Sequence, residues 1–413
     1  MTAVGIKCRV CGHETRDYLG DHLLEKHGVT VDAYLADHPG VATMSQRLLE
    51  LHKARHPAPR RAHPPKPNDL KVTWAGVEFG VNSSVPPEAC FKRPKEYRVP
   101  SHGALGTDIQ HFTISLRDPD CPPMYIHGPA GCGKDAAFQA WSADTLTPKI
   151  FRSIIPGADI ESWFFTREFD ANGTRWEEGP VLKGLRDGYT CPDGTVVPYL
   201  FLITDFDRAD RSQAEYLRLI TDTVEGRVAG PKGRVFPILE GTRVAATGNS
   251  CGSGDPRGRY ISSQPLDASI LDRFEVAVKF HQLDWNDEGP VVRAKFPFLV
   301  ERCPGIFPVM GRLTEALRIA ISNDELYAEF SHRALCAILK HSQRLLHLCG
   351  EGQTPENFIS KSLRVWLDKL PDKDTRQTAV NTLDPHVDGG LLDEGDTSHI
   401  KAAGSLADWA NKA

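Results

Sequence analysis

The sequence has no long apolar run. No stretch reaches the roughly 18 consecutive apolar residues of a membrane span, and the first residues lack the apolar core of a signal peptide. We therefore expect a cytoplasmic protein that does not enter a membrane. At 413 residues, the chain is long enough for about two or three folded units.

Cysteine usage argues against a secreted protein stabilised by disulfides, and the net charge argues against a protein that binds nucleic acid over its whole surface. The ten cysteines lack the spacing of a secreted disulfide framework, and the close pair of Cys8 with Cys11 favours metal ligation. A net charge of −5 gives no overall footprint for nucleic-acid binding. The segment 52–67 is nevertheless basic, rich in proline and free of acids, which predicts a semi-extended linker. Its basic residues are Lys53, Arg55, Arg60, Arg61 and Lys66.

Hydrophobic patterning predicts the fold class. Strand-like runs alternate with helical patterns, which indicates an α/β fold with a parallel sheet covered by helices. The predicted strands cover residues 124–126, 150–154, 199–204 and 243–247. From about Asp284 to His347 the pattern is mostly helical, which suits a small lid. We find no internal repeat.

We expect five parts along the chain. They are a zinc-finger-like module (1–50), a basic linker (51–70), an α/β nucleotide-binding domain (71–283), a helical lid (284–350) and a C-terminal extension (351–413). In the extension we expect one helix, near Phe358 to Leu370, followed by a poorly ordered tail rich in Gly and Asp.

The N-terminal module carries a candidate zinc site. Two cysteines with two residues between them are followed by two histidines with four residues between them, which is the spacing of a zinc finger. The four candidate ligands are Cys8, Cys11, His22 and His27. We expect Leu19, Leu23 and Leu24 to pack the histidine-bearing helix over the site, because a module this small needs a metal to fold. The alternative is an unliganded cysteine pair.

The histidine-bearing segment resembles the finger of the Ros/MucR type. In that family the finger touches DNA, and the adjacent Arg60-Arg61 could help here. Docking to a protein is an equal alternative, because the finger has acids where a DNA reader would have Lys or Arg. These acids are Glu14, Asp17, Asp21 and Glu25.

One segment further along fits the phosphate-binding pattern G-x-x-x-x-G-K: Gly128-Pro129-Ala130-Gly131-Cys132-Gly133-Lys134. In such a loop, backbone N–H groups and the lysine hold the β and γ phosphates of a nucleotide. The next position ordinarily has Ser or Thr, whose hydroxyl ligates Mg²⁺, but here it is Asp135. The pattern predicts nucleotide binding and leaves hydrolysis open.

Further motifs follow the loop in a recognisable order. An apolar strand ends in Thr204-Asp205-Phe206-Asp207-Arg208-Ala209, and another ends at Asn249; Leu271-Asp272-Arg273-Phe274 and Ser331-His332-Arg333-Ala334-Leu335 come later. This order resembles the AAA+ ATPases of the MoxR and cobaltochelatase type, in the branch with a helix-2 insert, over about residues 95–347.

The resemblance implies roles for individual residues. Asn249 would be the sensor-1 residue, Arg273 an arginine finger offered to the neighbouring subunit, and Arg333 the sensor-2 residue of the lid. The insert would be a hairpin that starts at Phe165 and turns at Asn172-Gly173.

The magnesium residues depart from the family pattern. Thr204 stands where the family has the Mg²⁺-shell Asp, and Asp205 stands where it has the longer, water-orienting Glu. In one interpretation the donors have been exchanged, so that Asp135 supplies the carboxylate and Thr204 the hydroxyl around the same ion. The alternatives are decay of the site, or a register in which Asp205 is the shell residue. We expect ATP binding with slow hydrolysis.

Two functions from different classes fit these motifs. One is an ATPase motor that forms a ring, usually hexameric in this family, and remodels a partner that commonly bears a von Willebrand A domain. A cobaltochelatase ATPase subunit is the narrower form of this hypothesis. The other is a nucleotide-gated scaffold whose finger and basic linker hold DNA or a protein.

Overall fold

The computed structural model describes most of residues 6–386. The described residues are 6–15, 19–29, 31–38, 41–43, 70–118, 122–155, 157–170, 173–221, 227–230, 234–252, 254, 260, 263–349 and 355–386. The predicted basic linker with Arg60-Arg61 and the predicted loose tail after residue 386 lie outside them.

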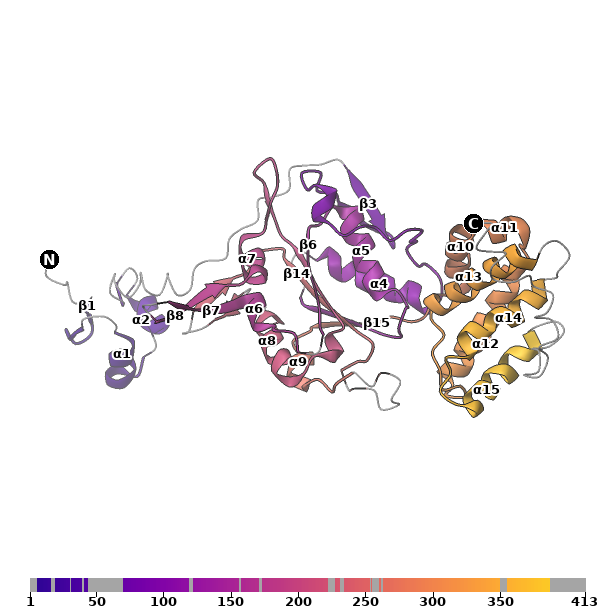
Figure 1. The fold of residues 1–413 in the computed structure, drawn as a ribbon. Helices are drawn as coiled ribbons and strands as arrows, with labels where there is room; N and C mark the ends of the chain where they lie inside the picture. The colour runs from indigo at the N-terminus through magenta and orange to yellow at the C-terminus, as the bar shows by residue number, and fades with distance from the viewer. Residues whose placement is uncertain are drawn as a thin grey trace.

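A five-stranded parallel sheet forms the centre of the α/β part of the chain (Figure 1). Its order is β15-β5-β14-β11-β6, which is 5-1-4-3-2 when the strands are counted along the chain. The strands are β5 (Met124–His127), β6 (Lys149–Ser153), β11 (Leu200–Thr204), β14 (Arg243–Gly248) and β15 (Val276–Lys279). Sequence patterning predicts the first four to within one residue. It misses β15, a short strand in which Val278 is the buried residue.

Helices cover both faces of this sheet, because the pleat sends successive side chains to opposite faces. In β11, Leu200 and Leu202 pack on the face with α4 (Gly103–Arg117) and α5 (Lys134–Thr145). Phe201 packs on the other face. That face is covered by α6 (Glu161–Phe164), α7 (Pro180–Asp187), α8 (Arg211–Thr221) and α9 (Ala268–Leu271). The result is the predicted α/β architecture, a parallel sheet covered by helices on both faces.

Antiparallel hairpins decorate the core. They are β3 (Lys71–Trp74) with β4 (Val77–Gly80), β7 (Phe165–Asp170) with β8 (Gly173–Glu178), β9 (Tyr189–Thr190) with β10 (Val196–Val197), and β12 (Arg227–Ala229) with β13 (Val235–Pro237). The β7–β8 pair is the hairpin expected as the insert, but its turn is misplaced in the prediction. Asp170 pairs with Gly173, so positions 171 and 172, outside the described residues, connect the strands instead of Asn172-Gly173.

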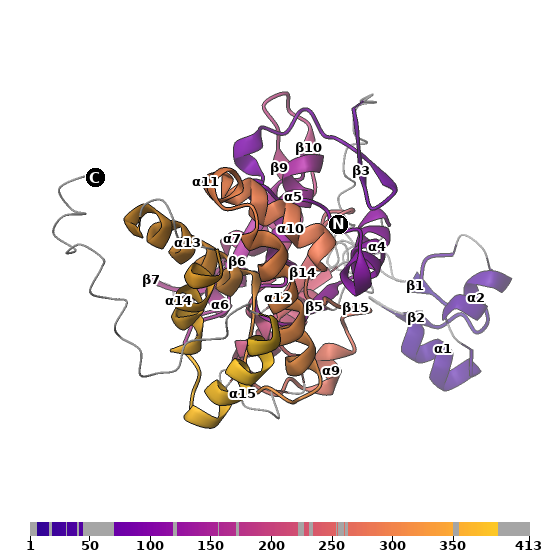
Figure 2. The same cartoon turned by 90° about the vertical axis from the view of Figure 1, so that its right-hand side faces the viewer.

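A bundle of helices follows the sheet and forms the lid (Figure 2). Its helices are α10 (Trp285–Lys295), α11 (Pro297–Arg302), α12 (Ile306–Ser322), α13 (His332–Cys349), α14 (Pro355–Leu367) and α15 (Lys373–Leu383), with a final 3₁₀ turn, η5 (Asp384–His386). No described helix has both the length and the apolarity needed to cross a membrane.

The expectation of one helix and then a loose tail after residue 351 is wrong for residues 373–386. Helix α15 and η5 occupy this segment, and Ala379 and Leu383 are buried in the core shared with α12 and α14. The prediction fails because α15 is mostly polar and shows little apolar periodicity. Its start is nevertheless marked by Asp372, whose carboxylate accepts a hydrogen bond from the backbone N–H of Thr375.

The N-terminal module has a small core of its own. It contains β1 (Ile6–Lys7), β2 (Glu14–Thr15), α1 (Gly20–His27) and α2 (Val31–Asp37). Ile6, Cys8, Leu19, Leu23 and Tyr34 are buried together. Leu24 does not join them, contrary to the prediction, and is 62% exposed. On a helix, adjacent residues point about 100° apart, so Leu23 and Leu24 cannot both face so narrow a core.

Candidate nucleotide site and metal centre

The glycines of the loop after β5 are required by its backbone. Gly131 and Gly133 have φ angles of +73° and +100°, which other residues rarely adopt. Gly128 lies so close to Phe280 that a Cβ would stand 2.2 Å from its carbonyl oxygen. The loop leads directly into the N-terminus of α5, where backbone N–H groups and the helix dipole favour a bound anion.

Lys134, the first residue of α5, folds back over this loop. Its side chain is buried, and its ammonium group donates hydrogen bonds to the carbonyl oxygens of Gly128 (2.8 Å) and Pro129 (3.0 Å). It donates a third to Oδ1 of Asn249 (3.2 Å), which directly follows β14. Because β14 and β5 are neighbours, the predicted lysine and asparagine meet at one edge of the sheet.

Asp135 has a hydroxyl partner that sequence reasoning missed. Its carboxylate accepts a 2.7 Å hydrogen bond from Thr247, a buried residue of β14. Thr204 is also buried, and the alternation along β11 puts it on the same face as Leu202, toward α5. The proposed exchange of donors between Asp135 and Thr204 must therefore include Thr247. The available signal was a polar residue in an otherwise apolar strand, two positions before Asn249.

The donor set around Asp135 suits a hard cation. Carboxylate and hydroxyl oxygens are the ligands that Mg²⁺ prefers. The hydrogen-bonded pair of Asp135 and Thr247 offers one of each beneath α5, and the buried Thr204 lies on the same face of the sheet. These residues fit the Mg²⁺ ion that accompanies a nucleoside triphosphate at a P-loop.

Asp205 has a strained backbone at the carboxyl end of β11. Its φ of +56° is uncommon for a residue other than glycine. Its carboxylate accepts a 3.3 Å hydrogen bond from Ser153 and lies 3.3 Å from Arg208. This conformation turns the chain from β11 into the 3₁₀ turn η2 (Phe206–Arg208).

The neighbouring Asp207 is the second residue that sequence reasoning missed. It is fully buried, and its Oδ2 accepts hydrogen bonds from the backbone N–H groups of Asn249 (2.9 Å) and Ser250 (3.1 Å). The hydroxyls of Ser250 and Ser263 donate to the same oxygen. Asp207 therefore fixes the backbone of Asn249, and the repeat of acids at 205 and 207 was its signal in the sequence.

The lid reaches the P-loop through the start of α13. A Cβ added to Gly131 would stand 2.8 Å from Cβ of Ser331 and 3.8 Å from the backbone nitrogen of His332. Arg333 lies in the first turn of the same helix and is exposed. The structure thus brings the segment of the predicted sensor-2 residue to the nucleotide loop.

Arg273 lies on the opposite face of the sheet from α5. It follows α9 and is half-buried, and its neighbours Ile270 and Phe274 are anchored in the core beneath α6 to α9. The ring of Phe274 contacts those of Tyr125 and Phe206. Arg273 is therefore held in place by apolar residues on both sides.

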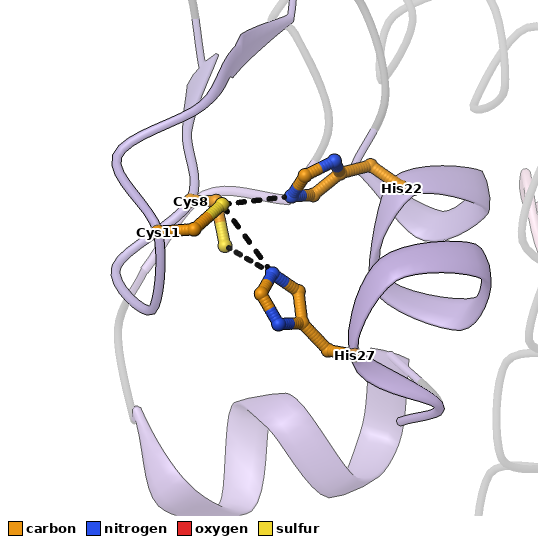
Figure 3. Close-up of side chains that lie close together, drawn as sticks. All are labelled: Cys8, Cys11, His22 and His27. Atoms are coloured by element: carbon orange, nitrogen blue, oxygen red, sulfur yellow. Dashed lines mark hydrogen bonds between the residues drawn. The ribbon is translucent and has the colours of Figure 1, made fainter.

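The predicted ligands of the N-terminal module converge on one point (Figure 3). The ligand atoms of Cys8, Cys11, His22 and His27 all lie within 4.8 Å of one another. The distances from sulfur to Nε2 are 3.1 Å for Cys11 and His22, 3.4 Å for Cys11 and His27, and 3.7 Å for Cys8 and His27. With Zn–S of about 2.3 Å and Zn–N of about 2.0 Å, a tetrahedral site has S–N edges of about 3.5 Å.

The environment of Cys8 favours the thiolate that a metal needs. Burial raises the pKa of the Cys8 thiol, but hydrogen bonds from the backbone of Cys11 and Val10 and from the side chains of Cys11 and Tyr34 together outweigh it, and the pKa lies below its usual value. Together with the geometry, this shows four groups that fit a metal ion.

Comparison with known proteins gives limited similarity. No protein-family model matches the chain. Protein CbbQ from Hydrogenophilus thermoluteolus is 30% identical over 95 residues, which are 22% of this chain and 34% of CbbQ, so the chain matches about a third of that relative's length.

Two solved structures show a weak similarity to the chain. A mutant of RuvB from Thermotoga maritima is 14% identical with a TM-score of 0.33, covering 75% of this chain and 79% of RuvB. NtrX from Brucella abortus, in complex with ATP, is 15% identical with a TM-score of 0.43, covering 76% of this chain and 61% of NtrX.

Proposed function

We propose that this chain is an AAA+ ATPase that binds and hydrolyses ATP as an oligomeric ring and remodels a partner protein or complex. The observation that carries the proposal is the meeting of Lys134, Asn249 and the Asp135–Thr247 pair at the N-terminus of α5. A buried ammonium group beside a glycine loop at a helix N-terminus is suited to polyphosphate.

The residues at this edge of the sheet divide the work of phosphoryl transfer. The loop N–H groups and Lys134 hold the β and γ phosphates, since the ammonium group exchanges its carbonyl partners for phosphate oxygens. Asp135 with Thr204 or Thr247 would hold Mg²⁺, which neutralises phosphate charge when bound. Asp205 and Asn249 act on the attacking water.

The ring is proposed from Arg273. Its place on the face opposite α5 suits a residue that serves the nucleotide site of a neighbouring subunit. An arginine supplied in trans stabilises the charge of the transition state and typically accelerates hydrolysis by about 10³–10⁵-fold. A rotational assembly of such head-to-tail interfaces closes into a ring.

Mixed rings test this proposal. The rate of ATP hydrolysis per subunit should rise with protein concentration, because each complete site needs two subunits. Arg273→Ala should bind ATP without turnover, and Lys134→Ala should not bind it. Mixing the two variants should restore part of the turnover at interfaces where a Lys134→Ala subunit offers its Arg273 to an Arg273→Ala site. A protein that stays monomeric with ATP and Mg²⁺ at all concentrations contradicts the ring.

We also propose zinc as the metal of the N-terminal module. Two cysteines and two histidines at these distances match a closed structural zinc site. The module buries few apolar side chains, so the ion would contribute much of its folding free energy. This proposal is independent of the nucleotide site.

A nucleotide-gated scaffold is the second candidate, and Asp135 favours it. A carboxylate next to the phosphates repels them unless a cation intervenes, so such a site holds ATP weakly and hydrolyses it slowly or not at all. ATP binding with no measurable hydrolysis at any protein concentration would select the scaffold over the motor.

A further inference from the structure

Two adjacent acids of the first lid helix, Asp287 and Glu288, sit where the lid joins the core. The carboxylate of Asp287 is hydrogen-bonded to the core. It accepts hydrogen bonds from the backbone N–H groups of Ser101 and His102 (2.8 Å each), from the hydroxyl of Ser101 (3.2 Å) and from Nδ1 of His102 (2.8 Å). These residues precede α4, whose N-terminus favours a negative charge.

The carboxylate of Glu288 is hydrogen-bonded within the lid. It is fully buried, and its two oxygens accept hydrogen bonds from the guanidinium group of Arg318 in α12 (2.6 and 3.1 Å). Nδ1 of His332, the first residue of α13, lies 2.8 Å from Oε1. Burial raises the pKa of Glu288, but His332 and Arg318 outweigh it, so the pKa lies below its usual value and the carboxylate is charged.

Arg318 connects the two ends of this arrangement. Besides Glu288, it donates to the carbonyl oxygen of Leu283, where the chain enters the lid, and to that of Phe330, just before Ser331. The position of Ser331 therefore depends on the same charged group as the junction with the core. Ser331 is also the residue that lies against Gly131 of the P-loop.

We propose that Asp287 and Glu288 are positioning residues that hold the start of α13, with Arg333, against the P-loop, so that lid position and nucleotide affinity depend on each other. The proposal rests on the proposed nucleotide function of the loop. Neither acid touches the loop itself. Asp287 fixes α10 to the core through its hydrogen bond to His102. Glu288, next to it in α10, contacts His332 at the start of α13, and the preceding Ser331 packs against Gly131.

The isosteric variant Glu288→Gln tests the proposal, because it removes the charge and keeps the shape. With fluorescent N-methylanthraniloyl nucleotides as the probe, we expect it to weaken ATP binding by about 10-fold. We further propose that Arg333 contacts the γ phosphate, so the effect on ADP should be smaller. Combining Glu288→Gln with Arg333→Ala should weaken ATP binding no more than Arg333→Ala does alone, because the effects of two substitutions that act through the same contact are not additive.

The matched control is Ser362→Ala in α14. It breaks a buried hydrogen bond of 2.7 Å to Ser342 within the lid, away from the core. It should lower the melting temperature without changing ATP affinity. A Glu288→Gln protein that melts earlier but binds ATP normally, or that adds its full effect to Arg333→Ala, overturns the proposal.

Asp287→Asn provides a second, milder variant on the core side of the junction. It should weaken ATP binding in the same direction while both parts stay folded, and unchanged affinity overturns the proposal even if Glu288→Gln does not fold. If the unaltered chain binds no ATP, the proposed function and the positioning role are both contradicted. If it binds ATP and neither Glu288→Gln nor Asp287→Asn changes the affinity, the positioning role alone is contradicted.

Discussion

The ammonium group of Lys134 donates a 3.2 Å hydrogen bond to Oδ1 of Asn249 and so joins the first turn of α5 to the end of β14. Phosphate oxygens are stronger acceptors for an ammonium group than an amide oxygen is. Binding of ATP is therefore expected to take Lys134 from Asn249 and to leave the asparagine side chain available to the reacting groups. Asp207 holds the backbone of Asn249 in place meanwhile.

Asn249→Ala should separate binding from turnover. Because Asn249 competes with phosphate for Lys134, the variant should bind ATP at least as tightly as the unaltered protein. Turnover should fall by about 10²-fold, the typical cost of removing one preorganised polar group. Steady-state kinetics with ATP checks both values. Asn381→Ala, at an exposed asparagine of α15, is the control. A variant with weaker binding and unchanged turnover at saturation would assign Asn249 to ground-state binding only.

The pair of Asp135 and Thr247 should behave as a coupled unit. Thr247→Val removes the buried hydroxyl that donates to Asp135, which should destabilise the protein by about 1–3 kcal/mol. Asp135→Ser alone restores the residue that P-loops ordinarily have. In a double-mutant cycle read by chemical unfolding, we expect a coupling energy of at least about 0.5 kcal/mol.

The same cycle can be run on the donors expected for magnesium. Asp135→Ser combined with Thr204→Asp restores the usual family pattern, and ATP turnover should tolerate it better than Asp135→Ser alone. Simple additivity of the two changes would favour decay of the site over exchange of its donors.

The N-terminal module should carry about one zinc ion per chain. Cys8→Ser should release it and make residues 1–50 sensitive to protease, because the ion stabilises a core of few side chains. ATP binding should persist. Metal content measured by atomic emission checks the first point, and Cys251→Ser, at an exposed cysteine outside the module, is the control. Full metal content in a Cys8→Ser/His27→Ala protein would refute the site.

The lid should become less stable at alkaline pH through His332. Burial lowers the pKa of its imidazole, but Cys336 and Glu288 raise this pKa by more than burial lowers it, and the result is about 9. Because the folded pKa lies above the usual value of about 6.5, this stabilisation is complete below about pH 6.5 and is lost as pH rises through about 9. The exposed Lys295 ammonium group lies 2.7 Å from Nε2 and opposes the charge, so protonation of Nε2 requires this contact to break, whereas the contact with the buried Glu288 favours the charged imidazole.

Melting temperatures between pH 7 and pH 10 check this prediction. The fall across this window should be steeper for the unaltered protein than for His332→Gln, which keeps a donor toward Glu288 but does not titrate. Equal slopes for the two proteins would show that His332 is neutral in the folded lid.

The sequence by itself determined the features that lie within short windows. The glycine loop with Lys134, four of the five parallel strands and the Cys/His ligand spacing each need a few dozen residues at most, and local sterics and apolar periodicity specify them. These patterns also led to the α/β class with a helical lid.

Only the tertiary structure decided which distant polar groups meet. Thr247 reaches Asp135 across 112 residues of chain, Asn249 reaches Lys134 across 115, and Asp287 reaches His102 across 185. Apolar periodicity tells a strand from a helix but does not give the order of strands in a sheet. That order chooses the neighbours, and burial then requires each polar group to find a partner among them.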